Sequence, residues 1–230
     1  IFMSIKLVVF DIAGTTIQDE TGVMEAFRST LKKNGYDVPM KEVAQVMGYK
    51  KIEAIAILLE NNEPDKSKIT PERIGTIHTD FVNHMISFYQ NSPAIAIFPH
   101  AEDTFRKLHD CGIKVGLNTG FTRAIADTII NRLQWQEKGL VDYLTASDEV
   151  ENGRPHPYMI NKMMQAFGII DPAEVAKVGD TEVDVREGQN AGCKYVIGIT
   201  TGSFTREELE LYHPTHIIDD IAEVIDIVTH

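Results

Sequence analysis

Short apolar runs that end in polar turns recur along the chain. The first covers residues 6–10, is rich in β-branched side chains and stops at Asp11. A run of this kind between turn residues predicts a strand that is buried on both faces. The same pattern predicts five further strands, at residues 113–117, 142–145, 175–178, 194–199 and 216–218.

Segments with helical periodicity lie between and after these strands. Their apolar residues recur every three or four positions, which is typical of an amphipathic helix. The predicted helices are residues 104–111, 122–133, 158–167, 182–191 and 221–228. Asp171-Pro172 adds a helix-start signal. Strands that alternate with helices predict an α/β fold, namely a Rossmann-like parallel sheet with helices on both faces.

Residues 17–98 interrupt this alternation. This stretch shows no convincing strand pattern, and its periodicity predicts helices at residues 21–34, 40–47, 51–60 and 70–90. We therefore expect two domains. Residues 3–16 and 99–230 would form the α/β core, and residues 17–98 would form an inserted all-helical cap domain.

Composition and charge narrow the function classes. Of the 230 residues, 43% are hydrophobic and 24% are charged, and the net charge is −12. This charge argues against binding of nucleic acid or an anionic membrane surface. No apolar run approaches the roughly 20 residues that a membrane span needs. Cys111 and Cys193 lack the spacing of a zinc site or disulfide framework, so we expect a cytoplasmic protein.

Residues that can carry chemistry follow several predicted strands directly. Asp11 follows the first strand, Thr119 and Gly120 follow the second, and Asp180 and Asp184 follow the strand at 175–178. Ligands bind at the carboxyl ends of parallel strands. Two carboxylates there suit Mg²⁺. Thr119, just before a predicted helix, offers a hydroxyl and free backbone N–H groups to a phosphate.

Arg154 adds a fixed positive charge in the loop between these elements. A metal, a cation and a helix N-terminus around one carboxylate are the parts needed for phosphoryl transfer to that carboxylate. A single strand-end Asp is more often a turn residue than a catalyst. The prediction therefore depends on Asp11, Thr119, Arg154 and Asp180 occurring together.

The chain resembles the haloacid dehalogenase superfamily of aspartyl phosphotransferases. The resemblance covers almost the whole chain, and its four motifs are FDIAGTT at 10–16, NTG at 118–120, GRP at 153–155 and VGDTEVD at 178–184. It implies that Asp11 is a nucleophile that forms an aspartyl phosphate. It also implies that Mg²⁺ is held by Asp11, the backbone carbonyl of Ala13 and Asp180. Asp184 would support this site.

Ala13 is an informative departure from this superfamily. Its phosphatases carry a second Asp at this position, which protonates the leaving alkoxide and then activates water. Ala can do neither, and loss of a general acid typically costs about 10²–10⁴-fold in rate. The chain therefore has a different chemistry, an acid from elsewhere, or weak phosphatase activity.

One branch, the phosphonoacetaldehyde hydrolases, has this Ala naturally and, like this chain at Arg154, has Arg in the third motif. Its cap lysine forms a Schiff base with the substrate aldehyde, so that P–C cleavage releases an enamine. The cap motif is similar to MGYKK at 47–51, which puts Lys51 at the Schiff-base position. The resemblance implies that Thr119, Gly120 and Arg154 contact the phosphoryl group.

Met47 and Gly48 of the same motif would line the substrate site. Three positions differ from this branch: Ala54 stands in place of a His, Thr21 in place of a Cys and Phe121 in place of a Tyr.

Two interpretations of Lys51 stay open, a Schiff-base lysine and a solvated lysine at a helix start. An amine sink must be deprotonated, which desolvation or a nearby cation such as Lys50 would favour.

Three functions stay open at this point. The first is Mg²⁺-dependent hydrolysis of the P–C bond of phosphonoacetaldehyde or a related carbonyl phosphonate. The second is a phosphatase acting on a small monoester such as phosphoglycolate or a sugar phosphate. The third is a non-catalytic phosphate-binding protein. The expected partner is a small molecule, and the resemblance implies a homodimer formed through the cap.

Overall fold

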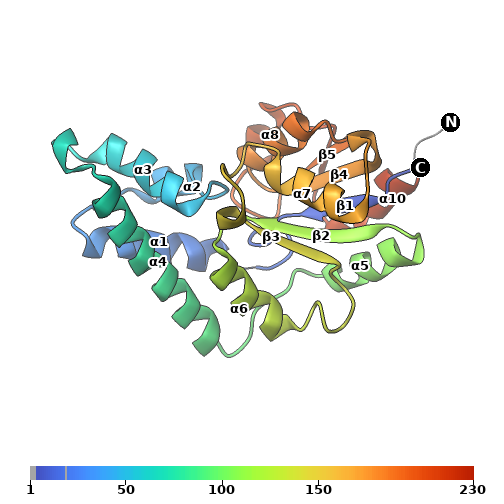
Figure 1. The fold of residues 1–230 in the computed structure, drawn as a ribbon, viewed down its shortest axis with the longest axis horizontal. Coiled ribbons are helices and arrows are strands. Elements are labelled where there is room, and N and C mark those ends of the chain that lie inside the picture. The colour runs from blue at the N-terminus through green and yellow to red at the C-terminus, as the bar shows by residue number, and fades with distance from the viewer. Residues whose placement is uncertain (1–3, 19) are drawn as a thin grey trace.

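A computed structural model describes residues 4–18 and 20–230 of the chain. Its described residues form one six-stranded parallel sheet with the strand order β3-β2-β1-β4-β5-β6 (Figure 1). The strands are β1 (Leu7–Phe10), β2 (Lys114–Thr119), β3 (Tyr143–Ala146), β4 (Val175–Gly179), β5 (Tyr195–Ile199) and β6 (His216–Ile218). The predicted α/β fold is confirmed.

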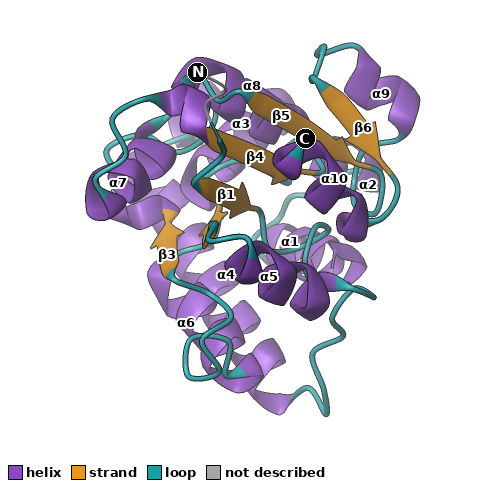
Figure 2. Cartoon of the chain, turned by 90° about the vertical axis from the view of Figure 1, so that its right-hand side faces the viewer, coloured by secondary structure: helices purple, strands orange, loops and turns teal. Residues whose placement is uncertain are grey.

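The central strand β1 shows why the sheet needs a cover on both faces. All four of its residues are buried, and successive side chains point to opposite faces. Leu7 and Val9 belong to a cluster with residues of the helix at 158–167, whereas Val8 and Phe10 belong to the main core with the helices at 101–110 and 123–133. Helices therefore lie on both sides of the sheet (Figure 2).

The helices of the structure follow the predicted order. They are α1 (Glu20–Lys33), α2 (Met40–Gln45), α3 (Lys51–Asn62), α4 (Pro71–Asn91), α5 (Ala101–Asp110), α6 (Arg123–Leu133), α7 (Tyr158–Phe167), α8 (Glu182–Ala191), α9 (Arg206–Glu210) and α10 (Val224–Thr229). None of them, in the part of the chain that is described, is long and apolar enough to cross a membrane.

The four helices α1–α4 lie together at one side of the sheet (Figure 1). We call them the helical segment. Phe27 of α1 and Phe81 of α4 are fully buried, and their rings meet edge to face with centroids 5.0 Å apart. An isolated bridge pairs Ile17 with Ile97, so the two ends of the segment leave the core side by side.

Two local details go beyond the prediction. Asp171-Pro172 does start a helix, with Asp171 as the N-cap and Pro172 in its first turn, but this is only the short 3₁₀ helix Pro172–Glu174, because β4 begins at the next residue. The helix α9 was not predicted. Its signal is a capping box, in which Thr205 accepts a hydrogen bond from the backbone N–H of Glu208 and the Glu208 side chain accepts one from that of Thr205.

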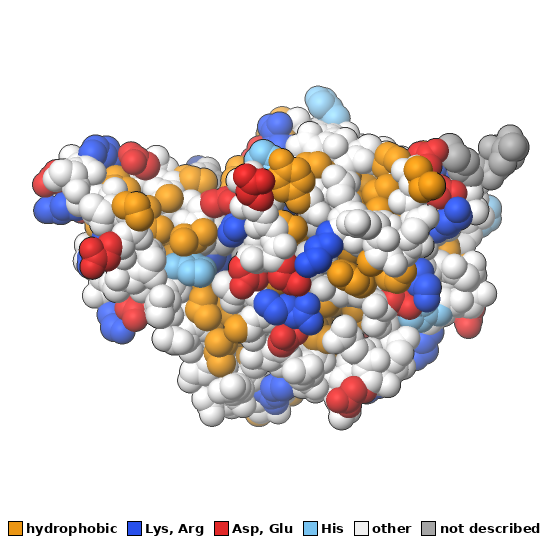
Figure 3. All heavy atoms as spheres, viewed as in Figure 1, with side chains coloured by type: hydrophobic (Ala, Val, Ile, Leu, Met, Phe, Trp, Pro, Cys, Tyr) orange, Lys and Arg blue, Asp and Glu red, His pale blue; other side chains and the backbone are white. Residues whose placement is uncertain are grey.

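Charged side chains of both signs are interspersed on the face shown in Figure 3. Many surface ion pairs are solvent-exposed, such as Arg106 with Asp103 at 2.7 Å and Arg206 with Asp219 at 2.8 Å. Exposed pairs of this kind contribute about 0–1 kcal/mol each. The stability of the fold therefore depends mainly on its buried apolar side chains.

We expect Phe81→Ala to destabilise the protein by about 3–5 kcal/mol, because it leaves a cavity against Phe27. The control Phe88→Ala, on the same helix but 36% exposed, should cost clearly less. Urea unfolding followed by circular dichroism measures both. Equal losses for the two variants would show that the Phe27–Phe81 contact is not central to the helical segment.

Candidate active site

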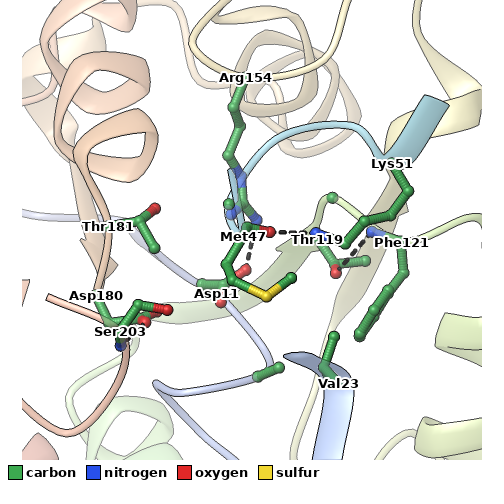
Figure 4. A pocket seen from close by; sticks show the side chains of 13 residues that line it. Asp11, Val23, Met47, Lys51, Thr119, Phe121, Arg154, Asp180, Thr181 and Ser203 are labelled. Atoms are coloured by element: carbon green, nitrogen blue, oxygen red, sulfur yellow. Dashed lines mark hydrogen bonds and ion pairs between the residues drawn. The ribbon is translucent and has the colours of Figure 1, made fainter. Parts of the chain in front are cut away.

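The carboxyl ends of β1, β2 and β4 meet beneath the turn between α2 and α3. The register places Phe10 beside Leu117 and Val178, so Asp11 follows its strand where the neighbouring strands also end. A cavity of about 360 Å³, its mouth included, opens at this point (Figure 4). Its lining includes the predicted residues Asp11, Ala13, Met47, Gly48, Lys51, Thr119, Gly120, Arg154 and Asp180.

Asp11 lies at the floor of the cavity and is 6% exposed. Its Oδ1 accepts a hydrogen bond of 2.6 Å from Nη2 of Arg154. Burial raises the pKa of the Asp11 carboxyl, and the positive charge of Arg154 acts against this rise. One carboxylate oxygen is therefore fixed by the guanidinium.

Arg154 is almost completely buried, with 1% of its surface exposed. Nη2 also donates to the backbone and side-chain oxygens of Asn118, at 2.8 and 3.0 Å. Nη1 lies 2.8 Å from Asp184, and Nε lies 3.4 Å from Glu187. Burial acts to lower the pKa of Arg154, but the carboxylates, Asp184 first, hold it above its ordinary value. The guanidinium is thus held from several directions.

Lys177 and Glu187 complete this buried network, and the sequence analysis missed both. Lys177 Nζ lies 3.0 Å from Asp184 and 3.3 Å from Glu187, and it donates to Asn118 Oδ1 at 2.7 Å. Asn118 Nδ2 in turn donates to both carboxylate oxygens of Glu187. The sequence offered one signal for them, because Lys177 lies in a strand predicted to be buried on both faces. A buried lysine needs carboxylate or hydrogen-bonding partners nearby.

Carboxylate oxygens of Asp11, Asp180 and Asp184 lie within 4.8 Å of one another. Asp180 accepts hydrogen bonds from the Thr15 hydroxyl at 3.1 Å and the Ser203 backbone N–H at 2.8 Å. Gly14, at a φ of +91°, leaves space for this carboxylate, since a Cβ there would lie 2.6 Å from it. This cradle of oxygen donors fits a hard divalent cation such as Mg²⁺.

Asp184 differs from the other two carboxylates. It pairs with Arg154 and Lys177, and its Oδ2 accepts from both the backbone N–H and the hydroxyl of Thr181. These cations, set against the effect of burial, lower the pKa of Asp184 and favour its charged form. Asp11 and Asp180 therefore face the cavity, and Asp184 lies behind them.

Lys51 is the first residue of α3 and only 2% exposed. Its ammonium donates to the backbone carbonyls of Met47 and Tyr49, and it lies 5.7 Å from the centre of the Phe121 ring. Burial lowers the pKa of Lys51 to about 7, with Asp11 acting against this and Arg154 adding to it. The interpretation as a solvated lysine is therefore wrong.

Other positions that the sequence singled out fall in different surroundings. Lys50 donates to the carbonyls of Val150 and Glu151, so the cation that acts on Lys51 is Arg154. Ala54 is buried in the main apolar core. The side chain of Thr21 lies outside the described residues.

Phe121 lines the cavity, together with Thr181 of the fourth motif and with Val23 and Ser203, which no sequence signal indicated. Thr119, also in the lining, accepts a hydrogen bond from the backbone N–H of Phe121 at 3.1 Å.

Known proteins resemble this chain over most of its length. The family model of haloacid dehalogenase-like hydrolases matches residues 8–198. The chain is 34% identical over 220 residues to a bifunctional phosphonoacetaldehyde hydrolase/aminoethylphosphonate transaminase of Clostridioides difficile, spanning 90% of this chain but only 34% of that protein. It is 30% identical over 234 residues to a phosphonoacetaldehyde hydrolase of Bacillus mycoides, spanning 96% of this chain and 87% of that one.

Solved structures support the fold. A phosphonoacetaldehyde hydrolase-like protein from Oleispira antarctica superposes with a TM-score of 0.82 at 23% identity, over 98% of this chain and 92% of that one. A hydrolase from Pseudomonas syringae gives a TM-score of 0.83 at 16% identity, over 96% of each chain. At these identities the likeness extends to the fold alone.

We expect Asp180→Asn to weaken Mg²⁺ binding about tenfold or more, because it removes a charged oxygen ligand from the cradle. Isothermal titration with Mg²⁺ measures the effect. The control Asp219→Asn changes an exposed carboxylate that pairs with Arg206 and should leave binding unchanged. Unchanged binding in Asp180→Asn would mean that the cation site lies elsewhere.

Proposed function

Since this chain belongs to the haloacid dehalogenase-like hydrolases, it is a hydrolase, and we propose that it cleaves the P–C bond of phosphonoacetaldehyde or a related carbonyl phosphonate. Asp11 would be the nucleophile toward phosphorus, and Lys51 would form a Schiff base with the carbonyl group. The similarity to proteins named phosphonoacetaldehyde hydrolase supports this choice within the family.

The observation that carries the proposal is the buried amine of Lys51 in the same cavity as Asp11. A lysine with the ordinary pKa is almost entirely protonated at neutral pH. Because burial lowers the pKa of Lys51 to about 7, a large fraction of the amine is free to attack a carbonyl carbon. A phosphate monoester without an aldehyde or ketone group, such as phosphoglycolate, offers this amine no such reaction.

The proposed reaction proceeds through two covalent links to the chain. Lys51 Nζ attacks the aldehyde carbon, and loss of water gives the imine. An oxygen of Asp11 then attacks phosphorus, and the electrons of the P–C bond move into the imine to form an enamine. This leaving group has no ester oxygen that needs protonation, which explains why Ala13 can stand in place of an acid.

The remaining steps restore both residues. The enamine carbon takes up a proton, and water hydrolyses the resulting imine, releasing acetaldehyde and the free amine of Lys51. A second water hydrolyses the aspartyl phosphate on Asp11 and releases inorganic phosphate. One water is lost when the imine forms and two are used afterwards, so the reaction consumes one water.

The other residues of the cavity have distinct proposed roles. Arg154 holds one oxygen of Asp11 and so leaves the other for phosphorus. Thr119 and Gly120 would contact the phosphoryl oxygens. Asp11, Asp180 and the carbonyl of Ala13 would hold Mg²⁺, with Asp184 in support. When bound, Mg²⁺ would screen the charge of the phosphonate from the attacking carboxylate.

Met47 and Gly48, which carry the turn before Lys51, would line the carbonyl end of the substrate.

A phosphatase is the second candidate. Ala54 stands where related enzymes have a His, and it is buried in the apolar core. Because its methyl group has no acid or base, it cannot transfer a proton during imine formation. A phosphatase of this chain would act on a small monoester and would draw its acid from a position other than 13. The phosphatase hypothesis predicts that the Lys51→Arg variant still hydrolyses small phosphate esters.

Borohydride trapping tests the Schiff base. With phosphonoacetaldehyde and Mg²⁺ present, we expect intact mass to rise by one reduced adduct on the wild type. Lys51→Arg should form no adduct, because a guanidinium cannot make the imine. The control Lys68→Arg changes an exposed lysine and should behave as wild type. Turnover of small esters with no adduct on the wild type would favour the phosphatase instead.

The pH dependence should report Lys51. Only the neutral amine attacks a carbonyl, so the rate of imine trapping should fall about tenfold per pH unit below the pKa of about 7 and level off above it. Single-turnover trapping across this range measures the profile. A midpoint near the ordinary lysine pKa of 10.5 would contradict the buried, deprotonated amine.

A further inference from the structure

Residues 47–51 of the helical segment pass very close to the core. Three glycines mark the points of contact, one on this turn and two on core loops. A Cβ on Gly48 would lie 2.3 Å from the Thr181 hydroxyl, one on Gly120 would lie 2.4 Å from the Tyr49 carbonyl, and one on Gly153 would lie 2.6 Å from Lys50 Cβ. The backbone of this turn therefore lies so close to the core that these three positions have no room for a side chain.

Lys50 joins this turn to the loop that precedes Arg154. Its ammonium donates to the carbonyls of Val150 and Glu151, each at 3.4 Å, and its side-chain stem packs on Gly153. Its own carbonyl accepts the first backbone bonds of α3, from Glu53 and Ala54, both at 2.9 Å. Lys50 thus connects the start of α3 rigidly to the core.

The next residue, Lys51, is fixed from the same side. Its backbone N–H donates to the carbonyl of Gly120 at 3.3 Å. The side chain of Lys51 then turns into the cavity (Figure 4). The side chain of Lys50 instead reaches the carbonyls of the loop at 150–151. The backbone contact between Lys51 and Gly120 therefore lies between two lysine side chains, one that lines the cavity and one that binds the loop at 150–151.

We propose that Lys50 is a positioning residue, whose ammonium clamps the start of α3 to the loop before Arg154 and so sets the place of Lys51 above Asp11. The expected effect of Lys50 on the reaction rate rests on the proposed function. The contact of Lys50 with the loop at 150–151 does not, because it is a feature of the fold. The contacts of Lys50 are long, at 3.4 Å each, and the side chain is half-buried, so the ammonium adds a modest hold to a turn that the backbone contacts already place.

The test compares Lys50→Met, which keeps the stem and removes the ammonium, with Lys50→Arg, which keeps a cation. Net hydrogen-bond strengths predict that Lys50→Met lowers kcat and the trapping rate roughly 3- to 10-fold. KM should change little, since the phosphoryl contacts remain, and the midpoint of the pH profile should stay near 7. Lys50→Arg should recover most of the rate.

Hydrogen exchange on the Mg²⁺-loaded protein tests the clamp without any substrate. Peptides covering residues 48–54 should exchange roughly 3- to 10-fold faster in Lys50→Met, while peptides of α4 stay unchanged. If the wild type forms no imine, the proposed function fails but this measurement still decides on the clamp. The proposal would be overturned if Lys50→Met showed the same hydrogen exchange at residues 48–54 and the same trapping rate as the wild type. An upward shift of the pH midpoint would also overturn it, because Lys50 would then act through its charge on Lys51.

Discussion

The contact between Arg154 and Asp11 is the constraint around which the site is built. A buried guanidinium costs several kcal/mol unless its surroundings compensate it. Here Asp184 and Glu187 add ion pairs to the one with Asp11, Asn118 accepts two hydrogen bonds, and Lys177 brings a second positive charge among the carboxylates. The parallel sheet makes this compensation feasible, because it brings the ends of three strands to one place.

The sequence was enough to predict the site residues that lie at the ends of strands. Asp11, Thr119 and Asp180 each follow an apolar run, and parallel strands present their carboxyl ends together. Lys177 and Glu187 could not be placed in the same way. Whether they reach the same guanidinium depends on the register of β4 and the rotation of α8, which a single sequence does not reveal.

The helical segment shows the same limit more sharply. Its helices follow from their periodicity, but the burial of Lys51 does not, since a lysine at a helix start is usually exposed. Its environment comes from core loops about 70 and 100 residues further along the chain, at Phe121 and Arg154. Packing between distant segments, and not local sequence, lowers the pKa of this lysine to about 7.

The bridge between Ile17 and Ile97 has a consequence for how this amine is guarded. Because both connections run side by side, any hinge between the helical segment and the sheet would lie at this bridge. Lifting the segment would return Lys51 to water, where the ordinary lysine pKa of 10.5 keeps it protonated. On the proposed chemistry, an open molecule would then present an aldehyde with an ammonium ion, and the reactive amine would exist only where the helical segment covers the cavity.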